Sequence, residues 1–326
     1  MSQAKLAFWN ANGLQQHLPE LKAFIEDKNL DVVLISETHF TEKSYVKIPN
    51  YKIYSTNHPA GTARGGSAII VRESINHTVN ENYSTNHIQC TSISTNMSFG
   101  LVTFAAIYCP PRYSINTDQY KHFFQSLGNC FVAGGDYNAK HTIWGSRLVS
   151  PKGRVLFKTM QSMNLSHISS GSPTYWPSDL NKTPDLIDFC VTKGIPINHT
   201  KVESCLELSS DHTPVLVTLF DRFKCNDSSA TLYSKQTNWD QFRLKVTQSL
   251  ALNISLKTPI EIEEAIQLFN TTIQYAAWES TPAPKYQNAS KTLSSGVAEL
   301  IKNKRKLRKS WQQFREKGLE KCTSRI

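Results

Sequence analysis

Oxygen- and imidazole-bearing side chains recur at the ends of short apolar runs in this chain of 326 residues. The set consists of Asn10, Glu37, Tyr108, Asp136, Asn138, Asp188, Asp211 and His212. Carboxylate and amide oxygens favour a hard cation such as Mg²⁺ or Mn²⁺, and no Cys/His spacing in the sequence suits zinc. An aspartate beside a histidine suits an imidazole that handles a proton or a phosphate. The set therefore predicts metal-assisted hydrolysis of a phosphodiester.

Such side chains need strands that end at a common rim, where loops carry the site. The sequence predicts a strand over 5–10 and then a helix over 14–29, whose leucines and isoleucine share one face. Further strands are predicted over residues 31–36, 65–71, 101–108, 130–134, 186–191 and 214–220, and further helices over 117–127 and 154–163. This alternation predicts an α/β fold, a four-layer sandwich of two packed mixed β-sheets flanked by helices.

Five segments, in order along roughly residues 5–220, resemble the endonuclease/exonuclease/phosphatase superfamily. They are Phe8–Leu14, Leu34–Thr38, Gly134–Ala139, Leu186–Phe189 and Ser209–Val215. A narrower resemblance is to the apurinic/apyrimidinic-type endonuclease domain of jockey-like non-LTR retrotransposon polyproteins. It is carried by Trp9–Leu14, Arg64–Ile69, Tyr108–Pro111 and Pro173–Trp176.

The resemblance implies a metal site for Mg²⁺ or Mn²⁺. Glu37 matches the metal-binding carboxylate of the family, Asn10 would complete the shell or hold its water, and Asp211 is a second potential ligand. Asn12 stands where base-excision relatives carry an aspartate. That departure argues against a specialised abasic-site repair enzyme.

The resemblance also implies catalytic roles for five residues. Asp136 would orient or deprotonate the attacking water, and Asn138 would hydrogen-bond a phosphate oxygen. His212 would contact the scissile phosphate, with its ring oriented by Asp188, and Tyr108 would donate its hydroxyl to the phosphate. Whether Asp136 or His212 is the general base stays open.

Four further residues near the site loops are predicted to contact the backbone of double-stranded DNA. They are Arg64, Arg112, Lys140 and Thr174. Contacts to phosphates position a duplex without reading its sequence.

The net charge of +10 is concentrated near the C-terminal end. Residues 1–224 carry 20 Lys+Arg and 17 Asp+Glu, whereas residues 301–326 carry 10 and 2. Together with a composition shift, this predicts a catalytic domain over 1–222, a linker over 223–236 and a basic helical connector over 237–326, with helices over 239–252, 260–278 and 293–317. The basic tail is either an RNA-binding segment for the element's own transcript or a solvated helix.

The sequence thus predicts a DNA endonuclease that nicks target DNA for retrotransposon integration by target-primed reverse transcription. The reverse transcriptase itself is absent from this chain and is expected downstream in a full-length element. A host abasic-site endonuclease or another phosphoesterase of the superfamily, and an inactive nucleic-acid-binding relic, are the alternatives. No apolar run is long enough for a transmembrane helix and the first residues do not form a secretory signal. The expectation is therefore a protein made in the cytoplasm, not secreted, without a membrane partner, that acts in the nucleus.

Overall fold

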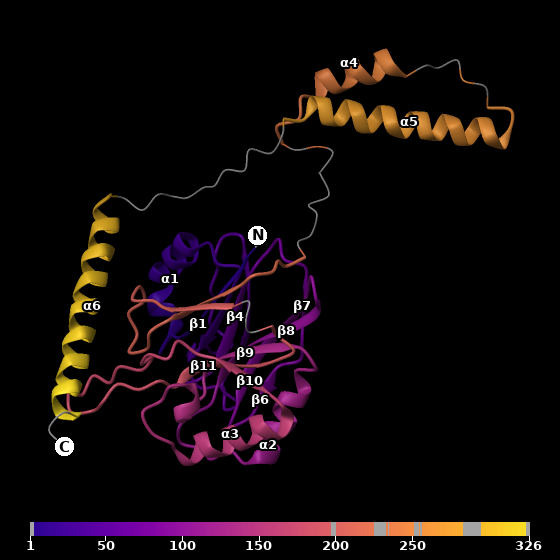
Figure 1. Ribbon diagram of the computed structural model, residues 1–326. Coiled ribbons are helices and arrows are strands. Elements are labelled where there is room, and N and C mark those ends of the chain that lie inside the picture. Colours follow the sequence, from indigo (N-terminus) through magenta and orange to yellow (C-terminus); the bar gives the residue numbers. More distant parts are fainter. Residues whose placement is uncertain are drawn as a thin grey trace. The chain divides into compact units, whose positions relative to one another are not determined.

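The computed structural model describes residues 3–196, 200–224, 233, 235–250, 254, 256–282 and 295–323, and for residues 295, 297–298 and 316–323 it describes the backbone alone. Within these residues, two mixed β-sheets are flanked by helices (Figure 1). This arrangement confirms the predicted α/β sandwich.

The first sheet combines one parallel pair of strands with antiparallel neighbours. Its strands are β1 (Ala4–Asn10), β2 (Val32–Ser36), β3 (Tyr51–Thr56), β4 (Ser67–Arg72), β12 (Thr200–Ser204) and β13 (Val215–Leu219). They lie in the order β12-β13-β1-β2-β4-β3, and β1 and β2 form the parallel pair. Since parallel strands end at the same edge of a sheet, Asn10 and Ser36 are register partners there.

The second sheet is built in the same way around the parallel pair β8 and β9. Its strands are β5 (His77–Val79), β6 (Tyr83–Ser84), β7 (Gln89–Met97), β8 (Gly100–Tyr108), β9 (Phe131–Asp136), β10 (Ser166–Ile168) and β11 (Asp188–Lys193). The order is β10-β11-β9-β8-β7-β5, and β6 also pairs with β7. Tyr108 and Asp136 therefore end neighbouring strands at one edge, and β11 begins there with Asp188.

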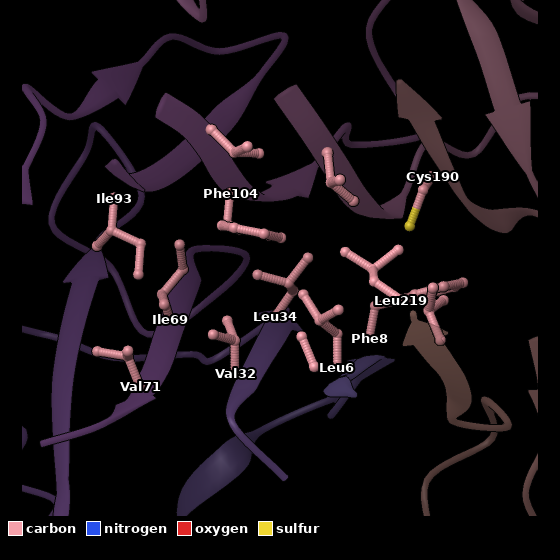
Figure 2. Close-up of a cluster of buried hydrophobic side chains, with 14 of the residues drawn as sticks. Leu6, Phe8, Val32, Leu34, Ile69, Val71, Ile93, Phe104, Cys190 and Leu219 are labelled. Atoms are coloured by element: carbon pink, nitrogen blue, oxygen red, sulfur yellow. The ribbon is translucent and has the colours of Figure 1, made fainter. Parts of the chain in front are cut away.

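Alternation along the strands creates three apolar layers. In β1, Leu6 and Phe8 point between the sheets, whereas Ala7 and Trp9 point to the outer face. Figure 2 shows the layer between the sheets, where Phe8 and Leu34 meet Phe104 and Cys190. Strands buried on both faces read as continuous apolar runs, which explains why the sequence showed them so clearly.

Helices cover the two outer faces. Helix α1 (Leu14–Lys28) buries Leu21 and Phe24 against the first sheet. Helices α2 (Thr117–Ser126) and α3 (Pro151–Met163) bury aromatic and aliphatic side chains against the second sheet. Burying a side chain of this size contributes about 1.5–3 kcal/mol, so these layers fix the strand ends in place.

The chain divides into two compact units. One comprises residues 1–225 with 293–326, and the other comprises residues 226–292. The first includes α6 (Ser295–Thr323), and the second contains α4 (Trp239–Ser249) and α5 (Pro259–Ser280). Most of the linker predicted over 223–236 lies outside the described residues. In the part of the chain that the structure covers, no helix has both the length and the apolarity to span a membrane.

Candidate active site

The strand ends of both sheets converge on one buried polar cluster. In the second sheet, Tyr108, Asp136 and Asp188 are neighbours across three strands. The Asn10 amide nitrogen of the first sheet donates to Asp136 Oδ2 at 2.9 Å. Ser36 adds a second link between the sheets, because its hydroxyl donates to the Ile107 carbonyl at 2.6 Å and accepts from the Asp136 amide at 3.1 Å. The packing of the two sheets thus sets the position of Asp136.

Glu37 follows β2 and is held as a carboxylate. Its Oε1 accepts from the Asn10 amide at 2.9 Å, and its Oε2 lies 3.3 Å from His39 Nε2. Burial acts to raise the pKa of Glu37, but the hydrogen bonds from His39 and Asn10 and the nearby charge of His212 outweigh it and lower the pKa. Glu37 is therefore ionised at neutral pH and available to a cation.

Left-handed backbone conformations gather around this carboxylate. Glu37 has a φ of 52° and His39 a φ of 55°, while Asn12 and Asn138 have φ values of 44° and 46°. Asparagine tolerates this region, whereas other side chains enter it at a cost of about 1–3 kcal/mol. The surrounding hydrogen bonds hold Glu37 and His39 in a conformation they would not adopt alone, as is typical of functional sites.

Asp136 is almost completely buried, with 1% of its surface exposed. Its Oδ1 accepts from the Asn138 backbone amide at 2.7 Å, and its Oδ2 accepts from the Asn138 side chain at 2.9 Å. Burial and the neighbouring Asp188 and Glu37 carboxylates raise the pKa of Asp136 well above its usual range. A bound cation would oppose that rise and favour the ionised form.

The preceding residue, Gly135, must be a glycine. Its φ is 146°, and a Cβ placed there would lie 2.1 Å from the Ile107 carbonyl oxygen and 2.6 Å from Ser36 Oγ. We expect Gly135→Ala to destabilise the fold by at least about 2 kcal/mol and to displace Asp136. Thermal unfolding measures the loss, with Gly296→Ala as the control, since a Cβ at Gly296 meets nothing within 4 Å. Equal melting temperatures for the two variants would contradict this account.

Asp188 and His212 form a buried pair. Asp188 Oδ2 lies 2.7 Å from His212 Nδ1. Burial acts to lower the pKa of His212, but Asp188 outweighs it and the pKa rises to about 9. His212 therefore carries a positive charge at neutral pH, which suits contact with a phosphate.

The loop 174–176 supports this pair. The Thr174 hydroxyl accepts from the backbone amides of Ile187 and Asp188 at 3.1 and 3.0 Å. The Tyr175 ring lies 5.0 Å from the His212 ring. Thr174 is fully buried, so its side chain supports Asp188 and does not reach a DNA backbone as the sequence had predicted.

The donor set fits a divalent cation. Ligand atoms of Asp136, Asp188 and His212 lie within 4.8 Å of one another. Asp188 Oδ1 is buried and has no hydrogen-bond partner among the described residues, and a buried acceptor of this kind calls for a cation or a donor. The ionised Glu37 adds a carboxylate joined to Asp136 through Asn10. The carboxylate oxygens of this set match the preference of Mg²⁺ or Mn²⁺, whereas a charged His212 offers no lone pair to a cation.

Two other predicted metal ligands lie at the edge of this set. Asn10 turns its amide nitrogen to the carboxylates, while its oxygen accepts from the Asn12 backbone amide at 3.0 Å. It would need to exchange its amide oxygen and nitrogen to bind a cation directly. Asp211 is half-buried, and its Oδ1 accepts from the Asn12 side chain at 3.3 Å.

Tyr108 stays a phenol. It is 7% exposed, and burial, together with the Glu37 and Asp136 carboxylates, raises its pKa. It also hydrogen-bonds to Glu37. The hydroxyl therefore lies beside the carboxylate cluster and donates to Glu37, and its predicted contact with the phosphate stays a prediction.

The predicted DNA-contacting cations lie on the surface. Arg64 is exposed and precedes Gly65, where a Cβ would lie 3.1 Å from the Tyr108 ring. Arg112 is exposed in the turn after β8. Lys140 is half-buried and pairs with the buried Asp185 at 3.0 Å. The backbone at Arg64 therefore lies close to Tyr108. The ammonium group of Lys140 is already paired with Asp185, which reduces its attraction for a phosphate.

Three supporting residues were missed by sequence reasoning. His39 received no role in the sequence analysis, yet it contacts Glu37. Ser36 and Tyr175 had received no role, although they touch Asp136 and His212. The available signal was position: each of the three lies within two residues of a predicted site residue or in a motif segment.

Comparisons with known proteins identify a family and relatives that the chain resembles. The sequence model described as the Endonuclease/Exonuclease/phosphatase family matches residues 7–212. The chain is 31% identical over 325 residues to the RNA-directed DNA polymerase from mobile element jockey of Drosophila melanogaster, and 32% identical over 326 residues to its counterpart from Drosophila funebris. Each alignment covers 99% of this chain and 36% of the relative, so the chain spans about a third of their length.

A solved structure shares the fold. The endonuclease domain of TRAS1, a telomere-specific non-LTR retrotransposon, superposes with a TM-score of 0.56 at 20% sequence identity. The match covers 67% of this chain and 98% of that domain.

Proposed function

Because this chain belongs to the endonuclease/exonuclease/phosphatase family, we propose that it is a metal-dependent DNA endonuclease that hydrolyses phosphodiester bonds. The observation that carries the proposal is the single buried network that joins Glu37, Asn10 and Asp136 and faces the Asp188–His212 pair. The ionised Glu37, the buried Asp136 carboxyl and the charged imidazole of His212 match what phosphodiester hydrolysis requires: a cation, a base and a donor to the phosphate.

The chain's own residues divide the work. Asp136 orients or deprotonates the attacking water, because its carboxylate is held by Asn10 and Asn138. His212, charged and aligned by Asp188, donates to the scissile phosphate. Tyr108 and Asn138 supply neutral donors at the same rim. His212 is charged at neutral pH and so is unsuited to accept a proton; Asp136 would act as the base once a bound cation holds its carboxylate ionised.

A cation held by Glu37, with Asn10 and Asp211 nearby, would neutralise charge on the phosphoryl oxygens and stabilise the leaving oxygen. We propose Mg²⁺, with Mn²⁺ as a substitute, since the set offers oxygen ligands.

The relatives support a proposal for the biological role. They are named RNA-directed DNA polymerases of mobile elements, so we propose that this domain nicks double-stranded target DNA for integration by target-primed reverse transcription. A reverse transcriptase would accompany it in the full-length protein, and the basic α6 segment would contact element RNA. The proposed place of action is the nucleus.

A plasmid assay tests the activity. Supercoiled DNA incubated with the protein and Mg²⁺ is expected to become open-circular, and EDTA is expected to prevent this. The proposal fails if the wild type does not nick, or if Glu37→Ala and Asp136→Ala both nick at the wild-type rate.

A second candidate, abasic-site repair, is separated by substrate. Asn12 offers an amide that bonds Asp211, not a further carboxylate. We therefore expect intact duplex DNA to be cut at least as well as a duplex with one abasic analogue, and a strong preference for the abasic duplex would favour repair.

The pH dependence of nicking is expected to report on His212. Its charged form acts, and its pKa is about 9, so activity should be present below that pH and fall as the pH rises through it. The same sign applies to stability: the pair's contribution is complete below the unfolded pKa of 6.5 and is lost as pH rises through about 9. Asp188→Asn removes the carboxylate that raises the pKa, so the alkaline fall should move to lower pH.

Rate profiles between about pH 6 and about pH 10 measure this shift. Asp118→Asn, an exposed aspartate on α2, is the matched control and should leave the profile unchanged. Superimposable profiles for wild type and Asp188→Asn would contradict the assignment of the alkaline limb to His212.

A further inference from the structure

One face of the basic helix α6 is hydrogen-bonded to other parts of the first unit. Lys304, Arg308, Gln312 and Arg315 recur every three or four residues, so they share one side of the helix. Gln312 and Arg315 are only 6% and 8% exposed, which is unusual for polar side chains on a highly charged helix. This face therefore does not behave as a solvated one.

Arg308 holds the loop that carries the catalytic histidine. Its guanidinium donates to the Leu208 carbonyl, to the Ser210 carbonyl at 2.8 Å and to the His212 carbonyl at 3.1 Å. A planar guanidinium with five donors suits several acceptors at once. Trp9 Nε1 donates to the same His212 carbonyl at 3.3 Å, so the backbone of His212 is fixed from two elements.

The next turns of α6 contact Thr213, beside His212, and the segment 176–182. Gln312 donates to the Thr213 hydroxyl at 3.2 Å. Arg315 donates to the Pro177 carbonyl at 2.5 Å and to the Lys182 carbonyl. The Trp311 ring lies 5.8 Å from the Trp176 ring. This segment continues from Thr174 and Tyr175, which contact Asp188 and His212.

We infer that α6 is a working part of the nuclease and that Arg308 is a positioning residue for the Asp188–His212 pair. The segment that matches the family model ends at residue 212, so α6, which makes these contacts to the His212 loop, lies outside that segment. The expected effect of Arg308 on the nicking rate rests on the proposed nuclease function. Its expected effect on the loop 208–212 rests on the contacts described above.

The test compares variants of the full chain. Arg308→Ala should lower kcat for plasmid nicking by roughly 10- to 100-fold, because small misplacements of a catalytic group carry losses of that size, while KM changes less than about twofold. Arg308→Lys should recover part of kcat, since an ammonium can still donate to two carbonyls. Arg243→Ala removes one exposed arginine from α4, and Gln313→Ala changes an exposed residue of α6; both should behave as wild type.

Hydrogen exchange supplies a readout that does not need activity. Arg308→Ala should speed exchange in the peptide over 206–214 and leave the core of β1 and β9 unchanged. Unchanged kcat together with unchanged exchange would overturn the inference, as would a change in KM alone. If the wild type does not nick but Arg308→Ala still speeds hydrogen exchange over 206–214, the nuclease proposal fails, while the role of Arg308 in holding this loop is supported.

Discussion

Asp136→Asn is expected to lower kcat for DNA nicking by about 10²- to 10⁴-fold, the usual range for removing a general base. The carboxamide keeps the shape of the carboxylate but cannot take a proton. Asp136 is buried and held by Asn10 and Asn138, so the substitution changes the acid–base chemistry of a side chain whose position is fixed. Single-turnover rates on supercoiled plasmid measure the effect.

The control for this prediction is Asp118→Asn, which also removes one aspartate charge but from the exposed first turn of α2. It should nick at the wild-type rate. Circular dichroism should show both variants folded. An Asp136→Asn rate within about threefold of wild type would remove Asp136 from the role of base.

Glu37→Gln is expected to weaken metal binding and reduce nicking by at least about 100-fold, since even residues that support a metal ligand contribute 10- to 100-fold. The substitution keeps a side chain of the same size but removes the charge that the structure holds ionised. The Mg²⁺ concentration for half-maximal nicking should rise, so a titration of rate against Mg²⁺ reports the change.

Glu42→Gln is the matched control, because Glu42 is exposed and lies five residues further along the same loop. Its Mg²⁺ titration should overlay that of the wild type. A Glu37→Gln titration with an unchanged midpoint and maximum would show that the cation is held elsewhere, with the carboxylates of Asp136 and Asp188 as the alternative.

The strands buried on both faces were predictable, and the polar ones were not. Residues 31–36 and 130–134 are apolar runs, and β2 and β9 lie there. Strand β7 was missed because it reads as Gln-Cys-Thr-Ser-Ile-Ser-Thr-Asn-Met. Its Thr91 hydroxyl is satisfied by Thr56 at 2.8 Å and by Ser67 at 3.0 Å. These hydrogen bonds join β7 to strands of the other sheet, so they depend on the fold. The sequence of β7 therefore shows no alternation of apolar and polar residues that would predict a strand.

Helix ends followed local chemistry. The helix predicted over 154–163 begins earlier, at Pro151, because Ser150 caps it and proline suits the first position. The helix predicted over 14–29 ends at Lys28, since Asn29 adopts a left-handed cap with a φ of 51°. Both signals are visible in the sequence once the cap is considered.

The site was predictable as a set, but its connections were not. Strand ends and motif order brought together Asn10, Glu37, Asp136, Asp188 and His212. The role of His39 depends on the left-handed turn at Glu37. The burial of Thr174 depends on the loop that packs under Asp188. The contacts of Arg308 join residues about a hundred positions apart, which no local pattern encodes.

The most direct measurement of the central claim is the nicking of intact supercoiled plasmid, in Mg²⁺, by the wild type and by a Glu37→Gln/Asp136→Asn double variant. The account predicts that the wild type converts the plasmid to the open-circular form, that EDTA stops it, and that the double variant leaves the plasmid supercoiled. An inactive wild type, or a double variant that nicks at the wild-type rate, would contradict it.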